Sequence, residues 1–363
     1  MSFTRLFYYI SSRSIFAAIT AFVLVLVLGR PIINVLFRKG ARDRQRMDIE
    51  LFPENKQGTP HMGGVLIILG SVVAILLWCN LADRFVQILL GVAVAFGGCG
   101  ILDDLLKVAR GNPQRGMSRY QKIGMQAVFG LIFGLIVLSE GTTPLPGILI
   151  SKLYIPFYKF PIMDLPFLVY LVFIILLVLY ASNAVNLTDG MDGLAVVPAL
   201  FTFALYGVYA WILGNEKWSD YFLFYLTEPG GNNLYLYTGE VSVFCAALIG
   251  SCLGFLWFNA YPAEVFMGDT GSLYLGGIIG ALIVLVKQEI LFFLVGGIFL
   301  LEFMSVFIQD YIGIRLLGRR IFFRAPLHHT FQHRGLAETK IVVRFWIISG
   351  ILTLISLATI KIR

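Results

Sequence analysis

Residues 86–107 read VQILLGVAVAFGGCGILDDLLK, an apolar run that ends in two adjacent carboxylates, Asp103 and Asp104. About 20 apolar residues are enough to cross the hydrocarbon core of a bilayer. Lipid offers the backbone no hydrogen-bond partner, so an α-helix is the expected form of such a run. Neighbouring carboxylates repel each other and resist ionisation close to lipid. The stretch therefore predicts a membrane-spanning helix with a divalent cation or a lysine beside the acids at its end.

The composition of the whole chain also indicates a membrane protein. Of the 363 residues, 58% are hydrophobic and 13% are charged, whereas soluble domains are about 45–50% apolar and about 25% charged. The net charge of +7 does not indicate nucleic-acid binding, because the charges lie in loops between apolar runs. The four cysteines lack metal-ligand spacing and are interpreted as small core residues. No cleavable signal peptide is expected, since no small-residue cleavage site follows the first apolar run.

We predict a single all-α, polytopic integral membrane domain over residues 1–363, built as a bundle of about ten transmembrane helices. The alternating ten-residue segments of a β-barrel are missing from the sequence. The predicted helices cover residues 15–37, 62–80, 86–103, 121–139, 166–183, 194–213, 241–258, 271–286, 290–312 and 342–360.

The positive charges predict the orientation of this bundle. Most of the 28 lysines and arginines follow the first, third and ninth predicted helices. Lysine and arginine collect on the cytoplasmic side of a membrane. Each loop is numbered here by the predicted helix that it follows. The odd-numbered loops are therefore expected in the cytoplasm and both termini outside, which agrees with an even number of spans.

Five polar motifs fall in the same odd-numbered loops. They are KQGTPHMGG (56–64), DDLLK (103–107), NAVNLTDGMDG (183–193), NAYPAEVFMGDTGS (259–272) and APLHHTFQHRG (325–335). Because these loops share one face of the membrane, we expect them to form one active site on the cytoplasmic side.

The first acidic motif combines Asp103 and Asp104 with Lys107, which follows them by four and three residues. At these spacings the lysine can pair with either acid on a helix. The plain alternative is a solvated helix end with a surface ion pair, and the motif alone favours neither interpretation.

The segment NLTDGMDG places Asn186, Asp189 and Asp192 at three-residue intervals around two glycines. On a helical turn the three side chains could share one face, and glycines let a ligand approach the backbone. Asp-Gly is also common in plain turns. One such pair would be enough for a turn, so the two pairs favour a binding segment.

The motif VFMGDTGS puts Asp269 at the start of a predicted helix, three residues after Phe266. An acid at this position is usually a helix cap, and a helix N-terminus is also a ready anion site. Phe266 either stacks on an aromatic base or packs in the core.

His328, His329 and His333 lie close to Arg324 and Arg334 in one loop. Grouped histidines and arginines indicate phosphate binding or proton handling. Magnesium is favoured over zinc, because no cysteine is near and carboxylates supply oxygen ligands. Carboxylates, lysines, histidines and glycines together are the parts that magnesium-assisted phosphoryl transfer requires.

In this order, the five motifs resemble those of the polyprenyl-phosphate N-acetylhexosamine-1-phosphate transferases, from about residue 30 to the C-terminus. GTPHMGG, FLWFNAYPAEVFMGD and VVRFWIIS (342–349) favour the branch that moves phospho-MurNAc-pentapeptide from UDP-MurNAc-pentapeptide to undecaprenyl phosphate. The products of that reaction are lipid I and UMP. The resemblance implies Mg²⁺ as cofactor, ten helices, a place in the bacterial cytoplasmic (inner) membrane, and the first membrane step of peptidoglycan synthesis.

The resemblance also implies roles for individual residues. The catalytic set is Asp103, Asp104, Asp269, His328 and His329. The substrate-binding set is Lys56, Lys107, Lys122, Asn186, Asp189, Asp192, Asn259 and Phe266. Within these sets, Asp269 would bind the magnesium ion and Asp103 would deprotonate the lipid phosphate. Lys107 and Lys122 would attract phosphates, and Phe266 would stack on uracil beside Lys56 and Asp192.

The histidine motif departs from the family pattern of three consecutive histidines, an aromatic residue and Glu. Thr330 stands where the third histidine is expected, and Gln332 stands in place of the Glu. Either His333 replaces the missing histidine or the position matters less.

Two other functions compete with this interpretation. A sister transferase would use UDP-GlcNAc with the same lipid. An ion-coupled transporter would also place acids in a membrane, but transport sites lie near the bilayer midplane in repeated halves. Here the acids gather on one face, and the sequence has no repeat. The sequence leaves open the oligomeric state, including a homodimer, the peptide variant accepted, and whether attack is direct or passes through an aspartyl-phosphate.

Overall fold

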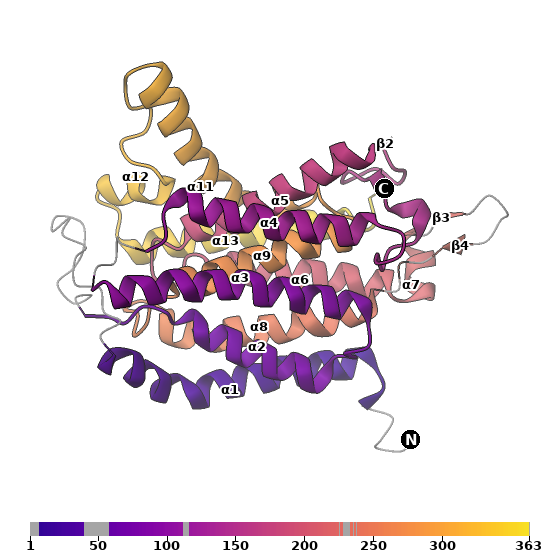
Figure 1. The fold of residues 1–363 in the computed structure, drawn as a ribbon, viewed down its shortest axis with the longest axis horizontal. Coiled ribbons are helices and arrows are strands. Elements are labelled where there is room, and N and C mark those ends of the chain that lie inside the picture. Colours follow the sequence, from indigo (N-terminus) through magenta and orange to yellow (C-terminus); the bar gives the residue numbers. More distant parts are fainter. Residues whose placement is uncertain are drawn as a thin grey trace.

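The computed structural model describes residues 7–39, 58–111, 116–224, 226–227, 233–234, 236 and 238–362. Within these ranges the chain forms a bundle of long helices that lie side by side (Figure 1). Nine helices in the described ranges are long and apolar enough to cross a membrane, and α2 (Gly64–Trp78) is a shorter apolar helix. The predicted class of all-α, polytopic membrane protein is confirmed.

The structure places a helix within each of the ten predicted ranges. Eight of the long helices are α1 (Ile10–Arg38), α3 (Arg84–Ala109), α4 (Arg119–Leu138), α5 (Phe167–Thr188), α6 (Val196–Leu213), α8 (Gly239–Asn259), α9 (Gly268–Leu285) and α13 (Glu338–Ala358). The ninth is α11 (Gly297–Phe307), continued by the π-helix η4 (Ile308–Leu316).

The remaining elements are short. They are η3 (Gly147–Leu149), α7 (Glu216–Tyr221), α10 (Phe292–Val295), α12 (Leu327–His333) and the strands β1 (Lys152–Leu153), β2 (Met163–Asp164), β3 (Leu226–Thr227) and β4 (Asn233–Leu234). The strands form two antiparallel pairs, in which Leu153 faces Met163 and Leu226 faces Leu234.

The first helix begins at Ile10, five residues earlier than predicted, and three further differences concern the motifs and the ninth span. The motif DDLLK does not open a loop, because α3 continues through it to Ala109. Helix α5 continues to Thr188, so that Asn186 lies on a helix. The predicted span 290–312 is divided at Gly296 into α10 and α11. In α3, Lys107 pairs with the two acids of the preceding turn, and such pairing supports a helix beyond its apolar part.

Helix α9 lies at the centre of the bundle, and all its residues from Thr270 to Leu285 are buried. Helices α3 and α5 pack against it (Figure 1). Two glycines bring α5 close, because a side-chain carbon at Gly276 would meet the backbone of Ser182, and one at Gly280 would meet Val178. Small residues at such contacts let helix backbones approach each other within a membrane. This packing holds the first turn of α9, which carries Asp269, between its two neighbours.

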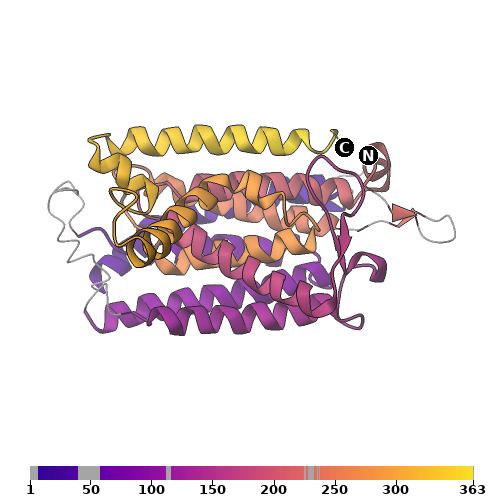
Figure 2. The same ribbon diagram turned by 90° about the horizontal axis from the view of Figure 1, so that it is seen from above.

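The start of α1 and the end of α13 lie at one end of the bundle, whereas α12 and the end of α3 lie at the opposite end (Figures 1 and 2). This arrangement agrees with an even number of crossings. The assignment of the α12 end to the cytoplasm remains a prediction from the positive charges.

Candidate active site

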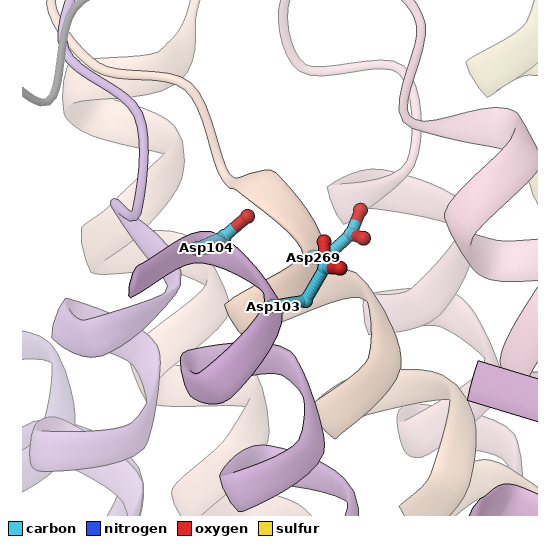
Figure 3. A group of neighbouring side chains, drawn as sticks. All are labelled: Asp103, Asp104 and Asp269. Atoms are coloured by element: carbon cyan, nitrogen blue, oxygen red, sulfur yellow. The ribbon is translucent and has the colours of Figure 1, made fainter. Parts of the chain in front are cut away.

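Three aspartates from distant parts of the chain meet at the end of the bundle that carries α12. Asp103 and Asp104 lie near the end of α3, and Asp269 lies in the first turn of α9 (Figure 3). Oxygen atoms from the three carboxylates lie within 4.8 Å of one another. Asp103 and Asp104 are 0% and 2% exposed. Carboxylates so well shielded from water require cations or hydrogen-bond donors close by.

Glycines allow the backbones of α3 and α9 to approach each other here. A side-chain carbon at Gly100, one turn before Asp103, would collide with the backbone of Asp269. Gly268, which precedes Asp269, has a φ of +70°, which glycine adopts readily. A side chain at Gly268 would also lie 2.7 Å from Asp104 Oδ2. Gly268 therefore allows both the turn into α9 and the close contact with α3.

Two lysines lie among the three carboxylates. The Nζ atom of Lys107 lies 2.7 Å from Asp103 Oδ2, 2.9 Å from Asp104 Oδ1 and 3.2 Å from Asp269 Oδ2. Lys122, in the first turn of α4, lies 3.0 Å from Asp103 Oδ2 and also pairs with Asp269. Three carboxylates and two ammonium groups leave one net negative charge. The predicted pairing of Lys107 with both neighbouring acids is confirmed, and Lys122 joins the same cluster.

Hydrogen bonds fix the orientation of each carboxylate. The backbone N–H of Met117 donates to Asp103 Oδ1 at 2.6 Å. The side chain of Asn186 on α5 donates to Asp269 Oδ1 at 2.8 Å and also bonds Ser272. Helices α3, α4, α5 and α9 therefore each contribute a polar side chain to this cluster, and α5 does so through Asn186.

The donor set of the cluster fits a hard divalent cation. Mg²⁺ prefers carboxylate oxygens, usually with waters and substrate phosphates completing its shell. Among the described residues, the three aspartates are the only group of three or more metal-ligating side chains. The cluster contains no cysteine or histidine ligand of the kind that zinc prefers.

The segment 189–193, named here the DGMDG segment, follows α5 and is held by hydrogen bonds to other parts of the chain. The backbone N–H of Gly193 donates to Asn259 Oδ1 at 3.0 Å, and Asn259 Nδ2 donates to the carbonyl of Val265 at 2.8 Å. Asp192 is 3% exposed and accepts a hydrogen bond from the backbone of Ala263. Asn259 thus joins the DGMDG segment to the segment before α9, while Asp189 caps α5 and remains partly exposed.

Phe266 lies where the first and fourth motifs meet. Its N–H donates to the carbonyl of Pro60 at 2.9 Å, and its own carbonyl accepts from Gly63 at 2.8 Å. The ring is partly exposed and lies 5.4 Å, between centroids, from the ring of His61. Phe266 is therefore not sealed in the core, as the plain interpretation of the motif would require. Lys56, the other predicted member of this pocket, lies outside the described residues.

The histidine motif forms α12, and its members differ in exposure. His328 is fully buried, His329 is partly exposed, and His333 is exposed with its ring against Phe323. The rings of His328 and His329 lie 4.2 Å apart. Buried Thr330 does not act as a histidine would, because its hydroxyl bonds both the backbone N–H and the carbonyl of Arg324.

Sequence reasoning missed Glu302 on α11, which is 0% exposed and accepts a hydrogen bond from the His328 ring. The signal was present, because Glu302 is the single charged residue in the run GIFLLEFMSVF. An ionisable residue inside a membrane helix is by default a candidate functional residue.

Comparisons with known proteins agree with this geometry. A family profile described as "Glycosyl transferase family 4" matches residues 86–287, and "Phospho-N-acetylmuramoyl-pentapeptide-transferase signature 1" matches residues 56–68. A phospho-N-acetylmuramoyl-pentapeptide-transferase of Francisella tularensis subsp. novicida (strain U112) is 42% identical over 98% of this chain and 94% of its own length. The protein of the same description from F. tularensis subsp. holarctica (strain OSU18) has the same identity and coverage.

Proposed function

This chain belongs to the phospho-N-acetylmuramoyl-pentapeptide-transferase family, and we propose that it transfers phospho-MurNAc-pentapeptide from UDP-MurNAc-pentapeptide to undecaprenyl phosphate. The products are lipid I and UMP. The observation that carries the proposal is the cluster of Asp103, Asp269, Lys107 and Lys122 at one end of a membrane bundle. The signature at residues 56–68 and the relatives support this donor over UDP-GlcNAc.

The position of the cluster suits the two substrates. The acceptor carries a phosphate on a long apolar chain, so its reacting group stays near the membrane surface. The donor is a water-soluble nucleotide and reaches that surface from the cytoplasm. The distribution of lysine and arginine supports a cytoplasmic position for the α12 end of the bundle, with both termini outside. Membership of the family supports a place in the bacterial cytoplasmic membrane.

Asp269, with Asp103 and Asp104 beside it, is the candidate magnesium site. A bound Mg²⁺ would neutralise the charge of the diphosphate and polarise its phosphoryl oxygens. The carboxylates are already shaped for this role, because Asn186, Met117 and the lysines hold them in place. We take Asp269 as the principal ligand, since it lies at the start of α9 and its carboxylate is grouped with those of Asp103 and Asp104 (Figure 3).

Lys107 and Lys122 bind the reacting phosphates. Each ammonium group carries three donors on a flexible stem, and each is partly exposed while it contacts the acids. Phosphoryl transfer depends mostly on positioning and on compensation of negative charge. The two lysines supply both at the place where the lipid phosphate and the nucleotide diphosphate meet.

Asp103 accepts the proton of the lipid phosphate. An oxygen of undecaprenyl phosphate forms a bond to the sugar-linked phosphorus of the donor. The bond from that phosphorus to the bridging oxygen breaks, and UMP leaves with both electrons. Asp103 is buried beside both lysines, which lets it take a proton at the point where the negative charge of the phosphate is already compensated.

The nucleotide half of the donor lies between the DGMDG segment and Phe266. The Phe266 ring stacks on uracil, and we assign polar contacts with the nucleotide to Asp192, Asp189 and Lys56. Asn259 shapes the pocket through its two backbone hydrogen bonds. His329 is the more exposed of the two neighbouring histidines, and we assign the contact with substrate to it.

The decisive experiment mixes purified protein with UDP-MurNAc-pentapeptide, undecaprenyl phosphate and Mg²⁺, and measures lipid I and UMP. We expect equimolar products, no product from UDP-GlcNAc, and no product with EDTA. Turnover of UDP-GlcNAc alone would assign the sister activity. Flux of either substrate across liposomes without any phosphoryl transfer would assign a transporter.

A further inference from the structure

Glu302 is a buried carboxylate that has no part in the acid–lysine cluster. It lies on α11 in an otherwise apolar run and is 0% exposed. A buried carboxylate needs hydrogen-bond donors to remain ionised. Both of its oxygens find donors in the same residue, His328. Oε2 lies 3.0 Å from the ring atom Nδ1, and Oε1 accepts the backbone N–H at 3.2 Å.

These two contacts fix His328 completely. His328 is the second residue of α12, and N–H groups in the first turn of a helix have no intrahelical acceptor. Glu302 supplies that acceptor from a neighbouring helix. The same carboxylate faces Nδ1 and can only accept, so Nδ1 carries the proton of this hydrogen bond. The pair therefore sets both the position of the ring and its tautomer.

The opposite edge of the ring contacts the DGMDG segment. A side-chain carbon at Gly190 would collide with Nε2 of His328, so the ring fills the space against the backbone of Gly190. Within the part of the chain that the structure describes, Nε2 is buried and has no hydrogen-bond partner. Its contact with the segment is consequently one of shape, and the ring orientation that Glu302 sets decides where Gly190 can lie.

The other half of the DGMDG segment is held differently. The backbone N–H of Asp192 donates to Glu338 at 3.1 Å, and the carbonyl of Gly193 accepts from the indole of Trp346 at 3.1 Å. Asp192 and Gly193 are thus fixed by hydrogen bonds from α13, while Gly190 is supported by the His328 ring. Gly190, which the His328 ring contacts, lies between Asp189 and Asp192 in the sequence.

We propose that Glu302 is a positioning residue which orients His328 so that its ring supports the DGMDG segment in its nucleotide-binding conformation. The inference rests on the proposed function, because it takes Asp189 and Asp192 as nucleotide ligands. It assigns His328 a positioning role in place of the catalytic role that the sequence resemblance implies. Contact with substrate then falls to His329.

The first test reads the tautomer of His328. The chain has four histidines, so protein labelled with ¹⁵N-histidine gives few signals, and a His328→Asn variant assigns the one of interest. We expect the proton on Nδ1 in the unmodified protein. In Glu302→Gln the amide oxygen can still accept from the backbone N–H of His328, but the amide NH₂ group can then only donate to Nδ1. The ring proton is therefore expected to move to Nε2. An unchanged tautomer in Glu302→Gln would overturn the proposal.

The second test separates KM from kcat. Glu302→Gln should raise KM for UDP-MurNAc-pentapeptide roughly two- to tenfold, the range for one lost hydrogen bond, with a smaller change in kcat. The matched control is Glu240→Gln, which breaks a partly buried pair with Arg13 far from the site and should leave KM unchanged. An unchanged KM in Glu302→Gln, or the same increase in Glu240→Gln, would overturn the proposal.

A third test applies even if Glu302 variants fail to fold. Gly190→Ala adds a methyl group where Nε2 lies and should raise the same KM, whereas adding Gly190→Ala to His328→Ala should cost nothing further. If the two substitutions instead raised KM additively, the ring of His328 would not act through its contact with Gly190, and the proposal would be overturned. Asp192→Asn tests the proposed nucleotide role separately. If it leaves KM unchanged, the pocket assignment fails, while the tautomer result still decides the link between Glu302 and His328.

Discussion

Asp104 on α3 holds the first turn of α9 through Thr270, whose backbone N–H and hydroxyl both donate to Asp104 Oδ2, at 2.8 and 2.7 Å. The first N–H groups of a helix lack intrahelical acceptors, and the helix dipole favours a negative charge there. One oxygen of Asp104 is thus used to join two helices. Its neighbour Asp103 instead directs an oxygen at both lysines.

Replacement of Asp104 by alanine should therefore destabilise the protein. The substitution leaves the buried N–H and hydroxyl of Thr270 without an acceptor, at a cost of about 1–3 kcal/mol. We expect a lower melting temperature of the detergent-solubilised protein. Thr270→Val removes only the hydroxyl bond and should have a smaller effect. If the variant lost turnover at an unchanged melting temperature, Asp104 would instead act directly in the reaction.

Asp269→Ala should abolish turnover and weaken metal binding. EDTA should stop the unmodified enzyme, and excess Mg²⁺ should restore it. Binding of Mn²⁺, followed by electron paramagnetic resonance, provides a readout that does not depend on activity. The matched control is Asp164→Ala, since Asp164 is an exposed acid paired with Lys152 in the hairpin between α4 and α5. Turnover at the normal rate in EDTA would refute the metal requirement.

Asp103→Asn should keep its affinity for UDP-MurNAc-pentapeptide and lose much of its rate. General-base catalysis contributes about 10²–10⁴-fold. The second ionisation of a phosphate monoester lies near pH 6, so the lipid phosphate loses its proton unaided as the pH rises. The defect should accordingly shrink between about pH 6 and 9. A defect that is constant over this range would leave Asp103 as a metal ligand, a nucleophile or a partner of Lys107.

Phe266→Ala should weaken nucleotide binding more than lipid binding. Loss of stacking on a base costs about 1–3 kcal/mol, and the Phe266 ring is partly exposed beside His61. Phe266→Tyr keeps the aromatic face and should retain affinity. Titration calorimetry with the UDP substrate measures the difference. Equal affinities in the alanine variant and the unmodified protein would remove Phe266 from the pocket.

Thr330→Val should lower stability without a specific loss of catalysis, because the Thr330 hydroxyl bonds the backbone of Arg324. The expected cost is about 1 kcal/mol, seen as a lower melting temperature, and Thr330→Ser should retain the bonds. If Thr330→Val instead lowered kcat at unchanged stability, the position would have a direct role in the reaction.

The membrane class, the helix positions and the shared face of the motifs could all be predicted from the sequence alone. Transfer of a helix into lipid depends on the apolar character of about 20 successive residues, which is a local property. The pairing of Lys107 with Asp103 and Asp104 was equally local, since helical spacing brings i+3 and i+4 side chains together. Hydropathy alone misplaced the end of α3, because a charged helix can continue beyond the bilayer.

Only the tertiary structure decided which distant residues meet. Asp269 reaches Asp103 because Gly100 lets two backbones approach, and Lys122 joins them from α4. Nothing in the local pattern around Glu302 points to His328, 26 residues away. Such contacts depend on how whole helices pack, and packing is set by shape complementarity over many residues. Sequence therefore determined the elements and their chemistry, whereas the packing of α3, α4, α5 and α9 determined the site.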